Sequence, residues 1–208
     1  KLESEPRIEW DNMHRGYDML RENEFNRAHF EALKAAQTGW PMVDACVVML
    51  RETGWLNFRM RAMIMSFASY HLWLHWRKPA LHLANLFTDY EPGIHYSQVQ
   101  MQSGTTGINA IRIYNPIKQG VDHDPEGVFI RHWIPELQDM DQSFIHTPWQ
   151  AVSQMNGYPM PVIDEKTARK SAAEKLYSLR KNNTTHKETA QKIVSKHGSR
   201  KSGLPRTM

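Results

Sequence analysis

The sequence has little cysteine and no run of apolar residues long enough to cross a membrane. Cys46 is the only cysteine in 208 residues, which excludes an internal disulfide and is typical of a reducing compartment. The stretch over residues 62–76 is apolar and free of Asp, Glu, Lys and Arg. It is shorter than the about 20 residues that a transmembrane helix needs. No apolar signal-peptide segment is visible near the N-terminus. These absences predict a soluble, cytoplasmic protein without a membrane partner.

Several cofactor and catalytic motifs are also absent. The sequence has no glycine-rich nucleotide loop of the GxGxxG or GxxxxGK[ST] type and no GxSxG nucleophile motif. His71 and His75 have the spacing of two ligands on one helix face, but no acidic residue completes an HExxH-like set. We therefore predict no metal site and interpret these histidines as core or surface residues.

Charge is unevenly distributed along the chain. Residues 166–208 contain 12 Lys or Arg and two acids, whereas residues 1–165 contain 14 Lys or Arg and 20 acids. A strongly basic segment is typical of contact with a polyanion, nucleic acid first. A solvated helical face that keeps the protein in solution explains the same composition. Both interpretations remain open at this point.

Helical periodicity dominates the sequence, and no alternating strand pattern is found. Val43, Cys46, Val47 and Leu50 form an apolar stripe at helical spacing. The patterns predict helices over residues 25–36, 40–51, 57–76, 79–87 and 124–133, and a last helix capped by Asp164. Residues 88–124 are expected to form loops and short helices, because they mix Gly, Pro, Asn, Gln and Thr.

The predicted fold class is therefore all-α. Residues 1–163 are expected to form one helical domain, and residues 164–195 a basic C-terminal helix or helices. Residues 196–208 are expected to form a disordered basic tail, because Gly, Ser, Pro, Lys and Arg occur there without periodicity.

Two arginines, Arg59 and Arg61, lie in the first turn of the predicted helix 57–76. A helix N-terminus carries about half a positive charge, so cations at this end indicate an anion nearby. Asp89, in the segment Asp89-Tyr90-Glu91-Pro92, is the best candidate for the counter-charge. A buried pair of this kind either belongs to a functional site or ties two helices together. The residues alone leave both interpretations open.

Ordered motifs over residues 25–150 resemble the FAD-binding domain of the photolyase/cryptochrome family. The motifs are Thr38–Ala45, Thr53-Gly54-Trp55, Arg59-x-Arg61, Trp76-Arg77, Asp89–Pro92, Arg112–Pro116, Gln119-Gly120, Asp124–Gly127 and Ile130–Leu137. The resemblance implies an all-α domain that binds FAD in a multi-helix bowl. The phosphate cradle and the α/β antenna domain of the family are expected upstream of Lys1. We therefore expect a bowl that is incomplete at its N-terminal side.

The resemblance also implies roles for particular residues. In the family, the positions of Arg61, Asp89, Tyr90, Glu91 and His95 lie around the flavin. The region that faces DNA or the lesion corresponds here to Phe58, Arg59, Gln100, Met101 and Gln119. Trp76 corresponds to a member of the tryptophan relay that photoreduces the flavin, and Trp73 is a second relay candidate.

These correspondences predict a flavoprotein that repairs DNA photolesions by blue-light-driven electron transfer from FAD. At three positions where the family has functional residues, this sequence has Val99, Met101 and Phe58. These departures favour an alternative, a cryptochrome-type photoreceptor that signals through a protein partner without repair. A third possibility is a helical interaction module that binds no flavin.

Overall fold

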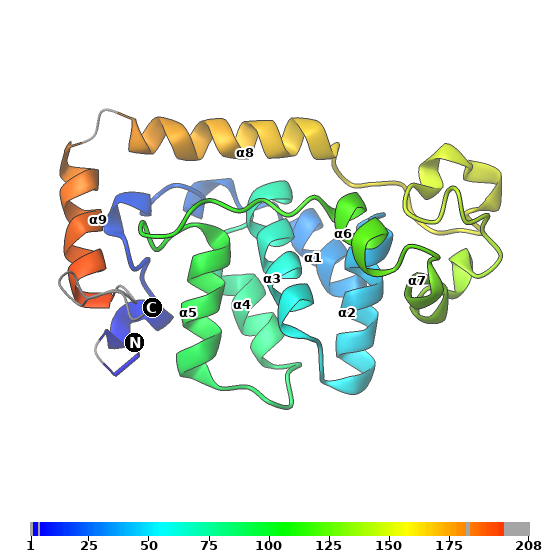
Figure 1. Cartoon of the computed structure of the whole chain (residues 1–208), viewed down its shortest axis with the longest axis horizontal. Coiled ribbons are helices and arrows are strands. Elements are labelled where there is room, and N and C mark those ends of the chain that lie inside the picture. The colour runs from blue at the N-terminus through cyan, green and yellow to red at the C-terminus, as the bar shows by residue number, and fades with distance from the viewer. Residues whose placement is uncertain (1, 4, 182–183, 198–208) are drawn as a thin grey trace, which may run out of the picture.

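The computed structural model describes residues 2–3, 5–181 and 184–197, and these residues form a helical protein (Figure 1). The α-helices are α1 (Arg27–Ala35), α2 (Pro41–Thr53), α3 (Phe58–Ser66), α4 (Arg77–Ala84), α5 (Pro92–Ser103), α6 (Pro116–His123), α7 (Val128–Trp133), α8 (Glu165–Arg180) and α9 (Thr184–His197). Seven short turns complete the described elements: the π-helical turn η4 (Phe67–His71) and the 3-10 turns η1 (Pro6–Glu9), η2 (Arg15–Tyr17), η3 (Glu22–Glu24), η5 (Pro135–Leu137), η6 (Pro148–Gln150) and η7 (Val152–Gln154). No strand occurs in these residues, so the all-α prediction is confirmed.

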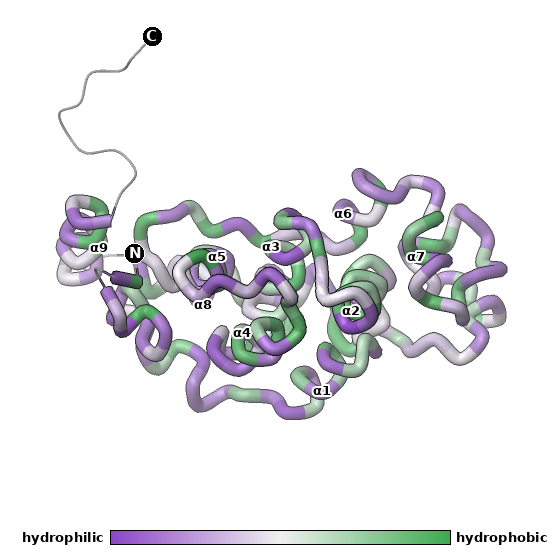
Figure 2. Tube along the Cα trace, turned by 90° about the horizontal axis from the view of Figure 1, so that it is seen from below, coloured by the Kyte–Doolittle hydropathy of each residue, from purple (hydrophilic) through white to green (hydrophobic). Residues whose placement is uncertain are grey.

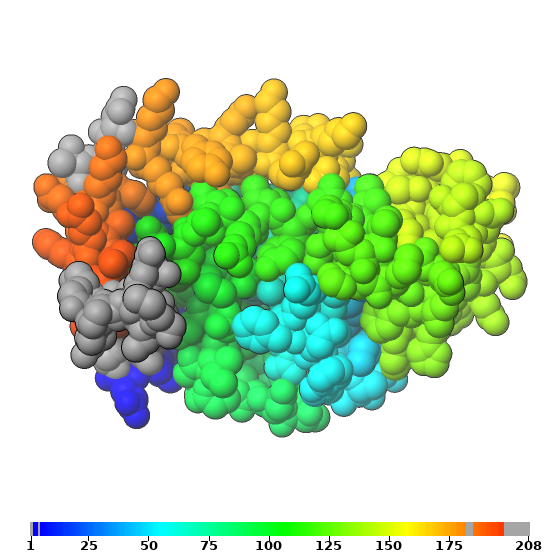
Figure 3. Space-filling model, viewed as in Figure 1, coloured from blue at the N-terminus to red at the C-terminus, as the bar shows by residue number. Residues whose placement is uncertain are grey.

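Four helices, α2 to α5, form the centre of the molecule (Figure 1). Helix α3 contacts both α2 and α5, and α4 packs against α5. Helix α8 runs across one edge of this group and contacts η4, while α9 lies at one end beside the N-terminal segment (Figures 1 and 3). The hydrophobic stretches gather in the central helices, and the outer connections are more hydrophilic (Figure 2).

The apolar stripe of α2 is buried as its spacing predicts. Val43, Cys46, Val47 and Leu50 are each at most 2% exposed and belong to the main core. The stripe packs against α3, which contributes further buried Met and Ile side chains. Gly54 ends α2 with a positive φ of 70°, a backbone conformation that favours glycine. This confirms the predicted boundary of the helix.

The predicted helix 57–76 is wrong in length. Asn57 caps its start as expected, because its side chain accepts a hydrogen bond from the Met60 N–H at 3.0 Å. The α-helix ends at Ser66 and continues only as the turn η4, and Trp73 then has a left-handed backbone with φ of 52°. Glycine usually occupies such a C-terminal position. Because a tryptophan occupies this position, the sequence did not indicate where the helix ends.

Residues 88–124 were predicted to form loops and short helices, and this prediction did not identify α5, which is 12 residues long. Its ends carry recognisable signals, because Pro92 lies in the first turn and Gly104 follows with a positive φ of 76°. The many Gln residues hid the helical pattern, since α5 has no continuous apolar stripe. This helix lines one side of a pocket, and the start of α3 lines another.

The basic C-terminal segment is helical over most of its described length. Asp164 caps α8 as predicted, by accepting a hydrogen bond from the Thr167 N–H at 2.9 Å. The expected disorder is wrong for Lys196 and His197, which end α9. The remaining residues of that prediction, 198–208, lie outside the described residues. Within the described ranges, none of the helices combines the length and apolar character needed to cross a bilayer.

A buried carboxylate holds the segment after η7 against α2. Asp44 of α2 accepts hydrogen bonds from Thr38, from Gly39 and, at 2.5 Å, from the Tyr158 hydroxyl. Burial raises the pKa of Asp44 to about 6, although the hydrogen bonds from Tyr158 and Thr38 act to lower it. Tyr158 lies 114 residues from Asp44 in the chain, so this contact fixes a long-range fold element.

We expect Tyr158→Phe to destabilise the protein by about 1–3 kcal/mol, because it leaves a buried carboxylate without one of its donors. Urea unfolding at neutral pH measures the change. Tyr177→Phe is the matched control, because Tyr177 is 57% exposed on α8. Its effect is expected to stay within about 0.5 kcal/mol. Equal stabilities of the two variants would contradict this account of the Asp44 contact.

Candidate functional site

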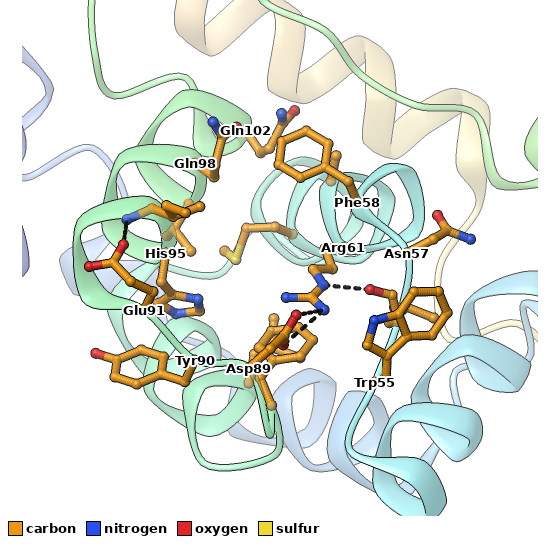
Figure 4. Close-up of a pocket in the computed structure, with 17 residues that line it drawn as sticks. Trp55, Asn57, Phe58, Arg61, Asp89, Tyr90, Glu91, His95, Gln98 and Gln102 are labelled. Atoms are coloured by element: carbon orange, nitrogen blue, oxygen red, sulfur yellow. Dashed lines mark hydrogen bonds and ion pairs between the residues drawn. The ribbon is translucent and has the colours of Figure 1, made fainter.

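A pocket of about 380 Å³ lies between the start of α3 and helix α5 (Figure 4). Its volume is at the lower end of the roughly 300–1,000 Å³ typical of small-molecule sites. The surface is hollowed between these two elements in Figure 3. The lining residues are Trp55, Leu56, Asn57, Phe58, Arg61, Ala62, Met65, Leu83, Phe87, Asp89, Tyr90, Glu91, Ile94, His95, Gln98, Val99 and Gln102. The walls are largely apolar, with a few polar groups directed inward.

Arg61 and Asp89 form an ion pair at one end of this pocket. The Arg61 Nη2 donates to both carboxylate oxygens of Asp89, at 2.8 and 3.0 Å. The Arg61 Nε donates to the Leu56 carbonyl, and its guanidinium lies 4.1 Å from the centre of the Phe87 ring. The hydrogen bond from Arg61 lowers the pKa of Asp89. Asp89 is therefore a carboxylate at neutral pH and is the counter-charge that the position of Arg61 required.

This ion pair is not buried, contrary to expectation. The Arg61 side chain is 25% exposed and that of Asp89 is 50% exposed. Asp89 lies in the turn before α5, where the side chain reaches the pocket edge from outside the core. Because an exposed pair contributes at most about 1 kcal/mol, stability alone is a weak reason for this arrangement.

Three further predicted residues line the same pocket: Tyr90, Glu91 and His95. Glu91 caps α5, because its carboxylate accepts hydrogen bonds from the backbone N–H groups of Gly93 and Ile94. The His95 Nε2 donates to the Ala80 carbonyl at 2.9 Å, which leaves Nδ1 as an acceptor. Burial lowers the pKa of His95, so the imidazole is neutral at pH 7.

The end of the pocket away from Asp89 carries two amides that the sequence analysis missed. Gln98 and Gln102 lie one helical turn apart on α5 and reach the cavity beside Phe58 (Figure 4). The Gln98 Oε1 is buried without a hydrogen-bond partner among the described residues. Phe58 is 58% exposed. Had α5 been recognised, the spacing of His95, Gln98 and Gln102 would have indicated one polar face.

The other residues expected to face DNA do not line the pocket. Gln100 is fully buried, and its amide bonds to the Ile8 and Asp11 carbonyls and the Met13 N–H. The prediction that Gln100 faces a DNA strand is therefore wrong in this structure, because helix α5 turns the Gln100 side chain toward the N-terminal segment. Met101 is half-buried, and Gln119 is buried on α6. Arg59 is exposed outside the pocket.

The two relay candidates differ in their surroundings. Trp76 is fully buried in the main core, and its Nε1 donates to the Asn12 side chain at 2.7 Å. Trp73 lies beyond η4, between the cationic groups of Arg21 and Lys175, each 4.5 Å from its ring centre. Neither lines the pocket. Among the residues that the structure describes, no group of three or more His, Cys, Asp or Glu side chains could hold a metal ion.

The lining residues suit a planar ring system with polar edges. Arg61 and Gln98 offer a donor and an unpartnered acceptor, and His95 offers Nδ1. Arg61 is the one Lys or Arg among the lining residues. A ring fits this set, whereas the phosphates of a dinucleotide find no second cation here. The pocket therefore suits a planar ring without attached phosphates.

Comparison with known proteins places the chain in a family. The sequence model described as the FAD binding domain of DNA photolyase matches residues 1–178. The deoxyribodipyrimidine photo-lyase of Escherichia coli (strain K12) is 34% identical over 149 residues, covering 69% of this chain and 32% of that protein. A cryptochrome DASH of Gloeobacter violaceus is 31% identical over 160 residues, covering 72% of this chain and 32% of that protein.

The fold is also similar to that of solved structures. The crystal structure of an archaeal photolyase from Sulfolobus tokodaii with two FAD molecules matches with a TM-score of 0.80 and 30% identity, over 85% of this chain and 41% of that one. The chain spans about a third of the length of the curated relatives it matches. Because sequence and fold agree over most of its residues, this chain belongs to the family of the FAD-binding domain of DNA photolyase.

Proposed function

We propose that the pocket between α3 and α5 binds the isoalloxazine ring of FAD in a flavoprotein that repairs DNA photolesions by blue-light-driven electron transfer. The observation that carries the proposal is the Arg61–Asp89 pair at the edge of an apolar pocket, in a chain of this family. Fixed charges beside a ring in a dry pocket are the means by which a protein tunes such a cofactor.

The residues of the pocket would divide the task of holding the ring. Arg61, fixed by Asp89 and the Leu56 carbonyl, presents its remaining N–H groups to an acceptor edge. His95 presents Nδ1, and the amides of Gln98 and Gln102 pair with the other polar edge. The apolar walls exclude water. When bound, FAD would supply the absorption of blue light and the electron that is transferred.

Damaged DNA is the proposed substrate at the mouth of this pocket. Phe58 and Trp55 are exposed aromatic side chains there, and such side chains stack on unpaired bases. A lesion would have to leave the duplex to reach them. Arg59 and the basic segment 166–208 would contact phosphates, which position a strand without reading its sequence.

We propose that Trp76 relays electrons through the protein core to the flavin ring. It is a large aromatic side chain in a packed core, which suits electron transfer between neighbouring rings. Trp73 remains the second candidate and borders the surface under α8. Tyr90 would cover the ring from the solvent side, because it lines the pocket and is partly exposed.

A photoreceptor of the cryptochrome type is the second candidate function. The similarity to a cryptochrome DASH favours it, as do Val99 on the pocket wall and Phe58 at the mouth. In this case the same residues would hold the flavin, and a protein partner would replace DNA.

Arg61→Met is expected to weaken FAD binding at least tenfold, because it removes the cation beside the ring and leaves Asp89 unpaired; a tenfold loss is about 1.4 kcal/mol. Titration followed by flavin fluorescence measures the dissociation constant. Arg51→Met, which removes an exposed arginine of α2, is the control and should bind as the wild type does. An unchanged dissociation constant for FAD in Arg61→Met would contradict the assignment of this pocket as the flavin-ring site.

Repair and signalling are separated by an assay of the purified protein with reduced FAD. Under blue light, single-stranded DNA with thymine dimers should lose the dimers, as measured by chromatography of the digested bases. A dark sample is the control. Persistence of the dimers under light, in a protein that binds FAD, would contradict repair of this lesion and favour the photoreceptor.

A further inference from the structure

Arg21 is a buried arginine without a carboxylate partner. Its residue is 1% exposed, and it follows η2 in the N-terminal segment that passes beneath α8 (Figure 1). Burial lowers its pKa to about 10, so the guanidinium still carries its charge at pH 7. An uncompensated buried charge is strongly unfavourable. Other groups around Arg21 must therefore stabilise its positive charge in place of an ion pair.

The carboxylates nearest in sequence are engaged elsewhere. Glu22 accepts a hydrogen bond from the Arg21 backbone N–H at 2.9 Å and lies 3.6 Å from His75. Glu24 binds the Lys175 ammonium at 2.6 Å. Among the described residues, no Asp or Glu oxygen lies within 4.0 Å of the Arg21 guanidinium. Within the described ranges, Glu22 and Glu24 therefore act on the Arg21 charge only from a distance, without an ion pair.

Aromatic rings compensate only part of the free-energy cost of burying the Arg21 charge. The Arg21 guanidinium lies 4.5 Å from the centre of the Trp73 ring and 5.6 Å from that of Tyr70. Stacking of this kind uses the flat faces of the group. The N–H donors point outward in its plane, and both Nε and Nη2 are buried without an acceptor among the described residues.

Other unpaired donors surround the same cluster. Arg180 at the end of α8 donates its Nε to the Tyr17 hydroxyl at 2.7 Å, but its Nη2 is buried and unpaired among the described residues. The Tyr70 hydroxyl is likewise unpaired. Burial raises the pKa of Tyr70 to about 12, against the charges of both Arg21 and Arg180. Tyr70 is therefore a neutral donor near both arginines.

Among the described residues, the groups left unpaired are N–H donors of two cations, Arg21 and Arg180, and the Tyr70 hydroxyl, which can also donate. A water molecule would supply acceptors but no charge. We propose that a small inorganic anion of the size of chloride binds beneath α8, between Arg21 and Arg180, with the Tyr70 hydroxyl as a third donor. This site is separate from the main pocket, because none of these three residues lines it. Its role is to tie the basic helix α8 to the N-terminal segment.

Thermal unfolding of the full chain in chloride tests the site. Sodium chloride is varied from 1 to 100 mM, and sodium gluconate, whose anion is too large to enter, holds the ionic strength constant. Above its dissociation constant, each tenfold rise in chloride should raise the folded-to-unfolded ratio tenfold. For a chain of this size that is a rise in melting temperature of roughly 3–5 °C. A parallel series with sodium phosphate shows whether a larger oxyanion also binds.

Arg21→Met should abolish this dependence on the anion, and Arg51→Met should retain it. If Arg21→Met does not fold, Tyr70→Phe retains both charges and should raise the dissociation constant of chloride about tenfold, because one hydrogen bond to the ion is lost. Stabilisation should then begin at an about tenfold higher chloride concentration. A melting temperature that responds to neither chloride nor phosphate would overturn the proposal. A chloride dissociation constant that is unchanged in Arg21→Met or in Tyr70→Phe would also overturn it.

Discussion

The contact between Arg61 and Asp89 links the first turn of α3 to the turn before α5, the two elements that enclose the pocket. A cation at a helix N-terminus opposes the helix dipole, so Arg61 needs a negative group beside it. Asp89 supplies this group at the edge of the pocket, where solvent screening makes the gain in stability small. The arrangement is therefore better explained by what the pocket holds than by the stability of the fold.

Much of the fold followed from the sequence, because Asn26 and Asp164 cap α1 and α8 and because α2 has a buried apolar stripe. Two errors have physical causes. Trp73 adopts a left-handed conformation that usually requires glycine, so the break after η4 was invisible. Helix α5 presents glutamines to the pocket and to the N-terminal segment instead of an apolar stripe, so its periodicity resembled that of a loop.

The candidate site was predicted in part. The charge at the start of α3 indicated a counter-charge at Asp89, and the structure places Tyr90, Glu91 and His95 beside the same pocket. The prediction that Gln100 faces DNA failed because α5 turns this side chain toward the N-terminal segment, whereas Gln98 and Gln102 line the pocket. Residues two positions apart on a helix point to nearly opposite sides. Unpaired donors such as those of Arg21 cannot be predicted from the sequence, because they depend on which acceptors lie near the side chain in the folded protein.

The pocket between α3 and α5 is proposed to be the site of the flavin ring. A crystal structure of the protein grown with FAD tests it most directly. The account predicts the isoalloxazine ring in this pocket, with the Arg61–Asp89 pair at one end and Gln98 and Gln102 at the other. A bound FAD whose ring lies elsewhere, with the pocket filled only by solvent, would contradict it.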